Sequence, residues 1–166
     1  MNKKVIFDEI YYPDVLEQTE MVFTHLQDML PNIDFRWAIV QYMKSEWRKH
    51  IEQGYPHEIS EWGDMVILKL FKDVDYPKTD LVADDWWSRT SWMSYVYNYL
   101  SYKYDIPFSE LADVVTFDYM MWRYVCGSEE GIAHVSNAIY EQFYNSDGTV
   151  KYDEVARVKK DRDWWI

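Results

Sequence analysis

Apolar residues recur at every third or fourth position along most of the chain, which is the spacing of amphipathic helices. Residues 13–30 are a clear example, with Val15, Val22, Phe23 and Leu26 in one stripe. The pattern predicts six or seven helices. The clear ones span residues 13–30, 33–53, 88–104, 109–126, 132–144 and 152–160, and two shorter candidates span residues 65–71 and 80–87.

Residues that stop or cap helices support these boundaries. Pro31 should end the first helix, and Gly54 the second, because neither residue favours a continuing helix. Asn32, Ser109 and Ser128 are suited to N-caps, because their side chains accept hydrogen bonds from the free amides of a first turn. The remaining connections are a loop at residues 54–60 and a turn at residues 145–148.

Two segments also fit a strand. Residues 65–71 form a short apolar run that either a helix or a strand can contain. Within residues 94–104, three tyrosines alternate between positions 95 and 99, as side chains on one face of a strand do. A helix is favoured for both segments. In the second segment the helical spacing persists for longer than the alternation, and Ser88 or Thr90 could cap its start.

Residues 109–126 are apolar on nearly every side, and a helix with few polar positions belongs in the middle of a domain. The lone cysteine, Cys126, lies in this segment, and its apolar surroundings predict a buried core thiol. The expected fold is therefore mainly α. It is a single domain over residues 1–166, a compact bundle of six or seven helices around a central helix at about 109–126, with room for a minor β element.

The charge balance limits the kinds of partner that the protein can bind. The chain of 166 residues contains 29 Asp and Glu against 17 Lys and Arg, a net charge of −12. Such a field repels phosphates, which disfavours direct binding to nucleic acid or to an anionic membrane and favours a basic protein partner. No apolar run approaches the roughly 20 residues of a membrane span. A single cysteine without a disulfide partner fits a reducing compartment.

Acidic residues gather on the first predicted helix, since residues 5–35 contain seven acids and no Lys or Arg. We expect Asp14, Glu17, Glu20 and Asp28 to form an acidic partner-binding face. At about 1.5 Å per residue, Glu17 to Asp28 covers about 16 Å, and a DNA strand presents one phosphate per about 3.4 Å. A carboxylate row of this length could enter a groove built for a nucleic-acid backbone. The alternative is a solvated helix face.

Two segments place acids directly before a tryptophan pair. Tryptophan is enriched in binding hot spots, so both segments are candidate partner-binding sites. The alternative is that each pair docks on the protein's own core, with one ring buried and the other at the surface. The candidate residues are Asp84, Asp85, Trp86 and Trp87 in the first segment and Asp163, Trp164 and Trp165 in the second.

Signatures of catalysis are weak. The sequence has no glycine-rich phosphate loop and no G-x-S-x-G elbow. Glu130 and His134 lie one helical turn apart and could share a metal ion, but a second such pair is missing, so a surface ion pair is favoured. His57 lies in the predicted loop without an identified partner. We therefore expect no metal and no cofactor, and favour a protein that is not an enzyme.

These features favour an acidic protein-interaction domain that inhibits a basic, nucleic-acid-handling protein such as a nuclease by mimicking DNA. In general character the chain is similar to phage antirestriction and anti-CRISPR proteins and to bacterial toxin-immunity proteins, although no motif carries that similarity. It implies a cytoplasmic protein of a bacterium or of a phage-infected host cell. The alternatives are a toxin-immunity protein, a helical enzyme or ligand-binding domain with a Tyr- and Trp-lined pocket, and an assembly scaffold. A homodimer is also open.

Overall fold

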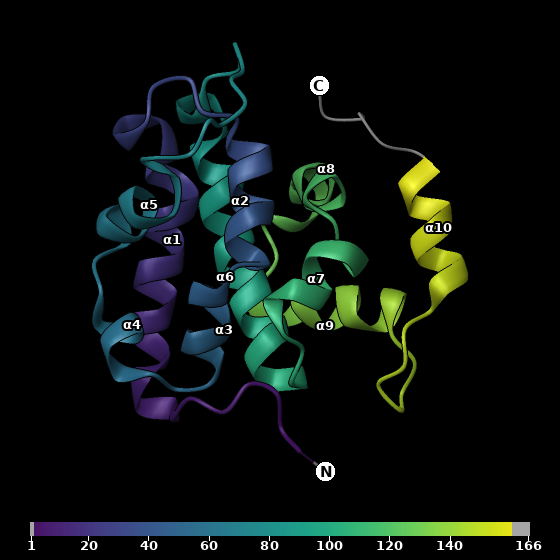
Figure 1. The fold of residues 1–166 in the computed structure, drawn as a ribbon. Coiled ribbons are helices and arrows are strands. Elements are labelled where there is room, and N and C mark those ends of the chain that lie inside the picture. The colour runs from purple at the N-terminus through teal and green to yellow at the C-terminus, as the bar shows by residue number, and fades with distance from the viewer. Residues whose placement is uncertain (1, 161–166) are drawn as a thin grey trace.

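The computed structural model describes residues 2–160, and within them the chain is built from helices (Figure 1). The mainly α class is confirmed, but this part of the chain has ten α-helices instead of six or seven. Its only β pairing is two isolated bridges, Ile33 with Lys78 and Tyr144 with Val150. The helices are α1 Tyr12–Met29, α2 Phe35–Met43, α3 Glu46–Glu52, α4 Pro56–Ser60, α5 Gly63–Phe71, α6 Trp87–Tyr104, α7 Phe108–Val114, α8 Phe117–Gly127, α9 Ile132–Phe143 and α10 Tyr152–Lys160, with two 3-10 turns, η1 Glu9–Tyr11 and η2 Ala83–Trp86.

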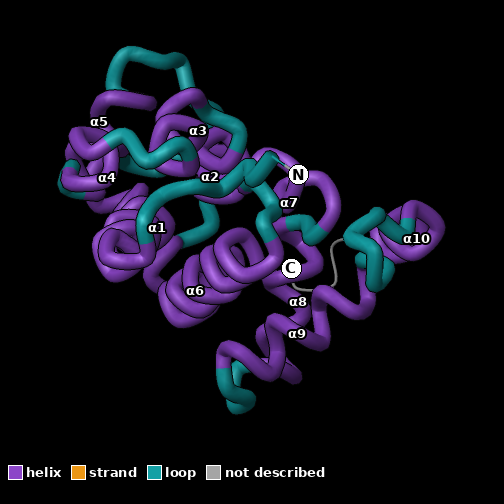
Figure 2. The backbone as a smooth tube through the Cα atoms, turned by 90° about the horizontal axis from the view of Figure 1, so that it is seen from below, coloured by secondary structure: helices purple, strands orange, loops and turns teal. Residues whose placement is uncertain are grey.

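Helix α6 runs through the middle of the molecule, with α1 on one side and α8 and α9 on the other (Figures 1 and 2). It buries apolar side chains such as Met93 and Val96 and also polar ones such as Ser94 and Asn98. Because buried polar residues interrupt the apolar stripe, the hydrophobic pattern does not mark α6 as central. Its helical state was predicted correctly, although Trp86 holds the N-cap position instead of Ser88 or Thr90.

The prediction of one continuous helix over residues 109–126 is wrong. The segment forms α7 and α8, and Thr116 between them accepts a hydrogen bond from the Tyr119 amide as the N-cap of α8. Apolar periodicity continues through the break because both helices pack against the same core. The far end of α8 is at the surface, where Val125 is 66% exposed and Cys126 is also exposed. The expectation that Cys126 is a core thiol is therefore wrong.

The predicted helix over residues 33–53 is also two helices, because Ser45 caps α3 by accepting from the Arg48 amide. At its start, Asp34 is the N-cap, while Asn32 has the positive φ of a turn. Residues 54–60, expected as a loop, contain the short helix α4, which begins at Pro56.

Three of the other expected segments are helical in the structure. Residues 65–71 lie in α5, and α9 and α10 match the expected helices at 132–144 and 152–160. Gly131, rather than Ser128, occupies the N-cap position of α9. Residues 80–87 contain only the 3-10 turn η2, which leads directly into α6.

The N-terminal segment is held against the end of α6 and covers a second, smaller core. The amides of Lys4 and Val5 both donate to Asp105 Oδ1 at 2.8 Å. Phe7 is buried in this core, and its ring lies against Tyr12 and Tyr102, with centroids 6.4 and 5.0 Å away. The members of the second core are Val5, Phe7, Val15, Ile51 and Ile59. This packing brings the start of α1 beside the C-terminal turns of α6.

Candidate functional site

The predicted acidic face of α1 is divided in the structure. Asp14, Glu17 and Asp28 are exposed, but Glu20 is half-buried and hydrogen-bonded with Tyr95, which raises the pKa of Tyr95 to about 12. Thr24, on the same helix face, is buried and donates to the Glu20 carbonyl at 2.8 Å. Because α5 and α6 both pack along α1, its carboxylates reach solvent near the two ends of the helix and not as one row.

At the N-terminal end of α1, Asp14 and Glu17 face the turn between α4 and α5. Together these elements form a depression of about 230 Å³, here called the acidic groove. Neither Asp14 nor Glu17 has an ion-pair partner among residues 2–160. The indole of Trp62, 56% exposed, lies at the same groove. The groove is lined by Asp14, Glu17, Gln18, Met21, Ile59, Ser60, Glu61, Trp62 and Gly63.

Gln18 positions the opposite wall of the groove. Its buried amide nitrogen donates to the carbonyls of Glu58 at 2.6 Å and Glu61 at 2.9 Å, and its amide oxygen accepts from Trp47 Nε1 at 3.1 Å. At Gly63, α5 approaches α1 so closely that a Cβ added to the glycine would lie 2.4 Å from Met21 Cβ. Gln18 and Trp62 were not among the residues predicted from the sequence. The sequence does contain a signal for Gln18, because this polar residue lies on the otherwise apolar face of the first helix.

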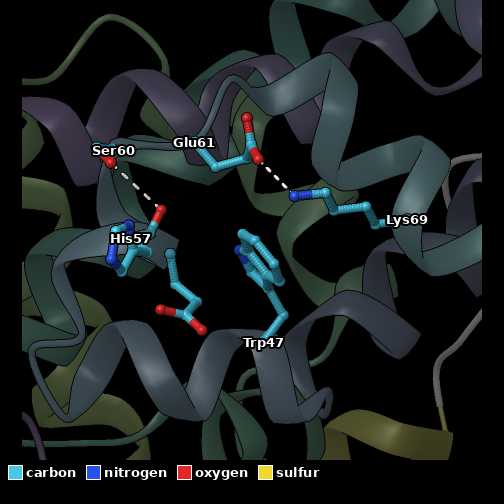
Figure 3. Close-up of a pocket in the computed structure, with 6 residues that line it drawn as sticks. Trp47, His57, Ser60, Glu61 and Lys69 are labelled. Carbon is cyan, nitrogen blue, oxygen red and sulfur yellow. Dashed lines mark hydrogen bonds and ion pairs between the residues drawn. The ribbon is translucent and has the colours of Figure 1, made fainter.

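A second depression of about 360 Å³ shares Ser60 and Glu61 with the acidic groove. Figure 3 shows its lining side chains. Glu61 pairs with Lys69 at 2.5 Å, and the Lys69 ammonium lies 5.2 Å from the centre of the Trp47 ring. The Lys69 hydrogen bond, together with the Trp62 amide, lowers the pKa of Glu61. The second depression is lined by Trp47, His57, Glu58, Ser60, Glu61 and Lys69.

The two depressions together present mostly negative charge. Their lining contains four acids, Asp14, Glu17, Glu58 and Glu61, and one lysine, Lys69. Carboxylates next to an exposed indole suit a guest that carries a cation on an apolar stem. Lysine and arginine side chains have this composition.

The second depression also contains residue types that catalyse hydrolysis, but they are not arranged for it. The Ser60 hydroxyl donates to the main-chain carbonyl of His57 at 3.3 Å, so it is directed at the helix backbone and not at an imidazole (Figure 3). Nucleophilic catalysis needs the hydroxyl within reach of a base. His57 shares this depression with Glu58, whereas His134 and Glu130 are not among its lining residues.

The first tryptophan pair is divided between the core and the surface. Trp86 is partly buried against the main core, with the Arg89 guanidinium 4.8 Å from its ring centre, and Trp87 is 46% exposed. Asp84 and Asp85 are exposed. The second set, Asp163, Trp164 and Trp165, lies outside the described residues.

Gln27 places the first Trp segment near the other end of α1. Its side chain donates to the Leu81 carbonyl at 2.9 Å and accepts from the Ala83 amide at 2.6 Å. Asp28 and the turn η2 are therefore neighbours at that end. Asp14 is 14 residues earlier, about 21 Å along the helix. The structure thus groups the predicted residues into two separate sets.

Glu130 and His134 form a surface ion pair at 3.6 Å, with the His134 side chain 80% exposed. The Arg123 guanidinium lies 4.0 Å from the other carboxylate oxygen of Glu130, and a cation so close disfavours a metal ion at this pair. Within residues 2–160, no group of three or more His, Cys, Asp or Glu side chains could hold a metal ion.

Comparisons with known proteins give no relative: no protein-family model, no curated protein and no solved structure matches this chain. Within residues 2–160, no helix is both long and apolar enough to cross a membrane.

Proposed function

We propose that this protein is a non-enzymatic interaction domain that binds a basic partner protein through the acidic groove. The observation that carries the proposal is the exposed Trp62 indole beside Asp14 and Glu17, two carboxylates without ion-pair partners among residues 2–160. Hot spots of protein interfaces are typically a large aromatic anchor surrounded by residues that exclude water. Arginine or lysine side chains of the partner would supply the missing opposite charges.

The rigidity of the groove favours binding over a purely solvating role. Gln18 holds its wall with buried hydrogen bonds, so little conformational entropy remains to be lost when a partner docks. The net charge of −12 adds a long-range field that would attract a basic partner and speed its encounter.

The proposal extends to the class of partner. A basic surface complementary to this groove is typical of proteins that bind nucleic acid. A protein that occupies such a surface competes with the nucleic acid and so inhibits the partner. The carboxylates would come from α1 and from the α4–α5 turn, two elements, and not from a single helix. A toxin-immunity protein would use the same surface against a basic toxin.

Paired charge-reversal variants test the proposal. We would use the wild type and three variants as baits in a bacterial lysate at low salt, and then measure the affinity of each captured protein by calorimetry. The groove variant is Asp14→Lys with Glu17→Lys, the anchor variant is Trp62→Ala, and the control is Glu129→Lys with Asp153→Lys. The control changes the net charge by the same amount as the groove variant, but at two exposed positions away from the groove.

We expect basic proteins to bind the wild type and the control, with affinity that falls as salt rises. The groove variant and Trp62→Ala should lose at least about tenfold in affinity, the typical loss for a hot-spot residue. Equal affinity of the groove and control variants would show that the groove is not the binding surface. Failure of all four baits to retain a basic protein would refute the proposed function.

A further inference from the structure

A third depression, separate from the acidic groove, lies where the start of α1 meets the C-terminal turns of α6. It has a volume of about 410 Å³ and is called here the tyrosine pocket. This volume is within the range of about 300–1,000 Å³ that small-molecule sites have. Its lining residues are Glu9, Tyr12, Tyr99, Tyr102 and Lys103.

The aromatic walls of the pocket are fixed from behind. The rings of Tyr12 and Tyr102 are 5.1 Å apart and tilted by 46°, and the buried Phe7 ring lies 5.0 Å from Tyr102. Phe7 belongs to the second core, so these tyrosines rest on packed structure and not on solvent. Walls of this kind need little reorganisation when a ligand binds.

The polar groups of the pocket are also held in place. Lys103 Nζ donates to Tyr99 Oη at 3.1 Å and to Asn137 Oδ1 at 3.0 Å, and its hydrogen bond to Tyr99 raises the pKa of Lys103. Burial raises the pKa of Tyr12 to about 12, so its phenol keeps its proton at neutral and also at mildly alkaline pH. The pocket therefore offers phenol hydroxyls, a donor ammonium and, on Glu9, an acceptor carboxylate.

These groups select the chemistry of the ligand. One acid and one base among the lining residues leave the pocket with no formal net charge, so neither a free anion nor a free cation is favoured. A phenol hydroxyl both donates and accepts hydrogen bonds, the ammonium donates them and the carboxylate accepts them. A ligand hydroxyl can also donate and accept, so ligand hydroxyls match all of these groups. Aromatic rings complete the fit, because they pack against the C–H faces of a sugar ring.

From this combination we infer that the tyrosine pocket binds a neutral saccharide, whose ring stacks on the tyrosines and whose hydroxyls accept from Lys103, donate to Glu9 and exchange hydrogen bonds with the phenols. The site does not depend on the acidic groove, and its occupant is uncharged. Binding at the pocket should therefore be insensitive to salt, whereas binding at the groove should weaken as salt rises.

The test is an NMR titration of the full-length, isotope-labelled protein with maltotriose, cellotriose and chitotriose, each at low and high salt. We expect at least one of these sugars to shift the amide signals of Tyr99, Tyr102 and Lys103 equally at both salt concentrations. Tyr99→Ala and Lys103→Met should each weaken that sugar about tenfold or more. Tyr99→Phe, which keeps the ring, should have a smaller effect.

The control is Tyr152→Ala, which removes a tyrosine that is 75% exposed outside the pocket and should leave the affinity unchanged. Circular dichroism confirms that each variant is folded. Absence of binding by all three sugars would overturn the inference. So would a sugar that binds Tyr99→Ala and Lys103→Met as tightly as the wild type, or stronger binding of choline or acetate than of any sugar. None of these results would bear on the acidic groove.

Discussion

Arg48 is the largest side chain in the described core without any exposed surface, and its charge is satisfied by neighbours from three helices. It donates to Glu52 Oε2 at 3.3 Å, to Thr19 Oγ1 at 3.1 Å and to Asn98 Oδ1 at 3.0 Å. Its guanidinium also lies 3.5 Å from the centre of the Phe108 ring. Burying a charge is costly unless such partners are present, so the network ties α1, α3 and α6 in one arrangement.

Removal of one partner of the buried pair should destabilise the fold strongly. Glu52→Gln leaves the Arg48 charge uncompensated, and we expect a loss of about 3–5 kcal/mol in the free energy of unfolding. Arg48→Met should also be destabilising, but the double variant should cost less than the sum, because neither charge is then left alone. Urea denaturation of the four proteins measures this cycle. Additive losses would show that the two residues are not energetically coupled.

The pH dependence of Arg48→Met has a definite sign. Burial raises the pKa of Glu52, and the neighbouring Arg48 opposes that shift. Without Arg48 the pKa of Glu52 should rise further. A carboxyl whose folded pKa is raised contributes stability below its unfolded pKa, and this contribution is lost as pH rises through the folded pKa. The deficit of Arg48→Met relative to the wild type should therefore be smaller at acidic than at neutral pH.

At the scale of helices, periodicity predicted most of the helical segments, but it missed the short helix α4 and did not show where long helices break. Residues 33–53 and 109–126 each keep an apolar stripe across a break, because the helices on both sides of the break bury apolar side chains. Helices α7 and α8 bury them in the main core, whereas α2 faces the main core and Ile51 of α3 belongs to the second core. The breaks are at Ser45 and Thr116, each of which accepts from the amide three residues later. Capping residues also occur inside helices, as Ser109 does in α7, so a cap alone could not locate the breaks.

This difference gives a matched pair of variants. Thr116→Ala removes the side chain that caps α8, and we expect it to cost about 1 kcal/mol of stability. Ser109→Ala alters a residue that the sequence suggested as a cap but that lies within the first turn of α7, and its effect should stay within about 0.5 kcal/mol. Thermal or urea unfolding compares the two. An equal loss at both positions would contradict the assigned role of Thr116.

The groove itself could be predicted only in part. Its carboxylates Asp14 and Glu17 follow from charge along α1, because acids without nearby bases are visible in the sequence. Trp62 and the α4–α5 turn could not be placed beside them, since that contact depends on how Gln18 holds a segment about 40 residues away. Side-chain hydrogen bonds across such distances leave no periodic signal.

At the scale of the whole molecule, several of the 15 tyrosines are part of the core. Burial is the main cause that raises the pKa of Tyr12 and Tyr119 to about 12, and it also raises the pKa of Tyr97. Tyr97 is fully buried and donates to the Val115 carbonyl at 2.5 Å. The core takes up much of the aromatic content, and part of that content is phenols that must keep their protons.

Alkaline pH should therefore unfold the protein. An unfolded tyrosine has a pKa of about 10, so between that pH and the raised folded values the unfolded chain releases protons that the folded chain retains. The stability contributed by protonated tyrosines is full below pH of about 10 and is lost as pH rises through the folded values, about 12 for Tyr12 and Tyr119. The part of the tyrosinate absorbance that comes from buried tyrosines should rise in the same steep transition in which circular dichroism shows loss of helix.

Tyr12→Phe isolates one of these protons. The free energy of unfolding should then fall less steeply with pH. Between the unfolded and folded pKa values of Tyr12, the slope should decrease by the equivalent of about one proton, or about 1.4 kcal/mol per pH unit. Tyr152→Phe, at a tyrosine that is 75% exposed, should leave the slope unchanged because solvent reaches its phenol in both states. Equal slopes for the two variants, or tyrosinate absorbance that titrates fully before the helical signal is lost, would show that the tyrosine protons are not coupled to folding.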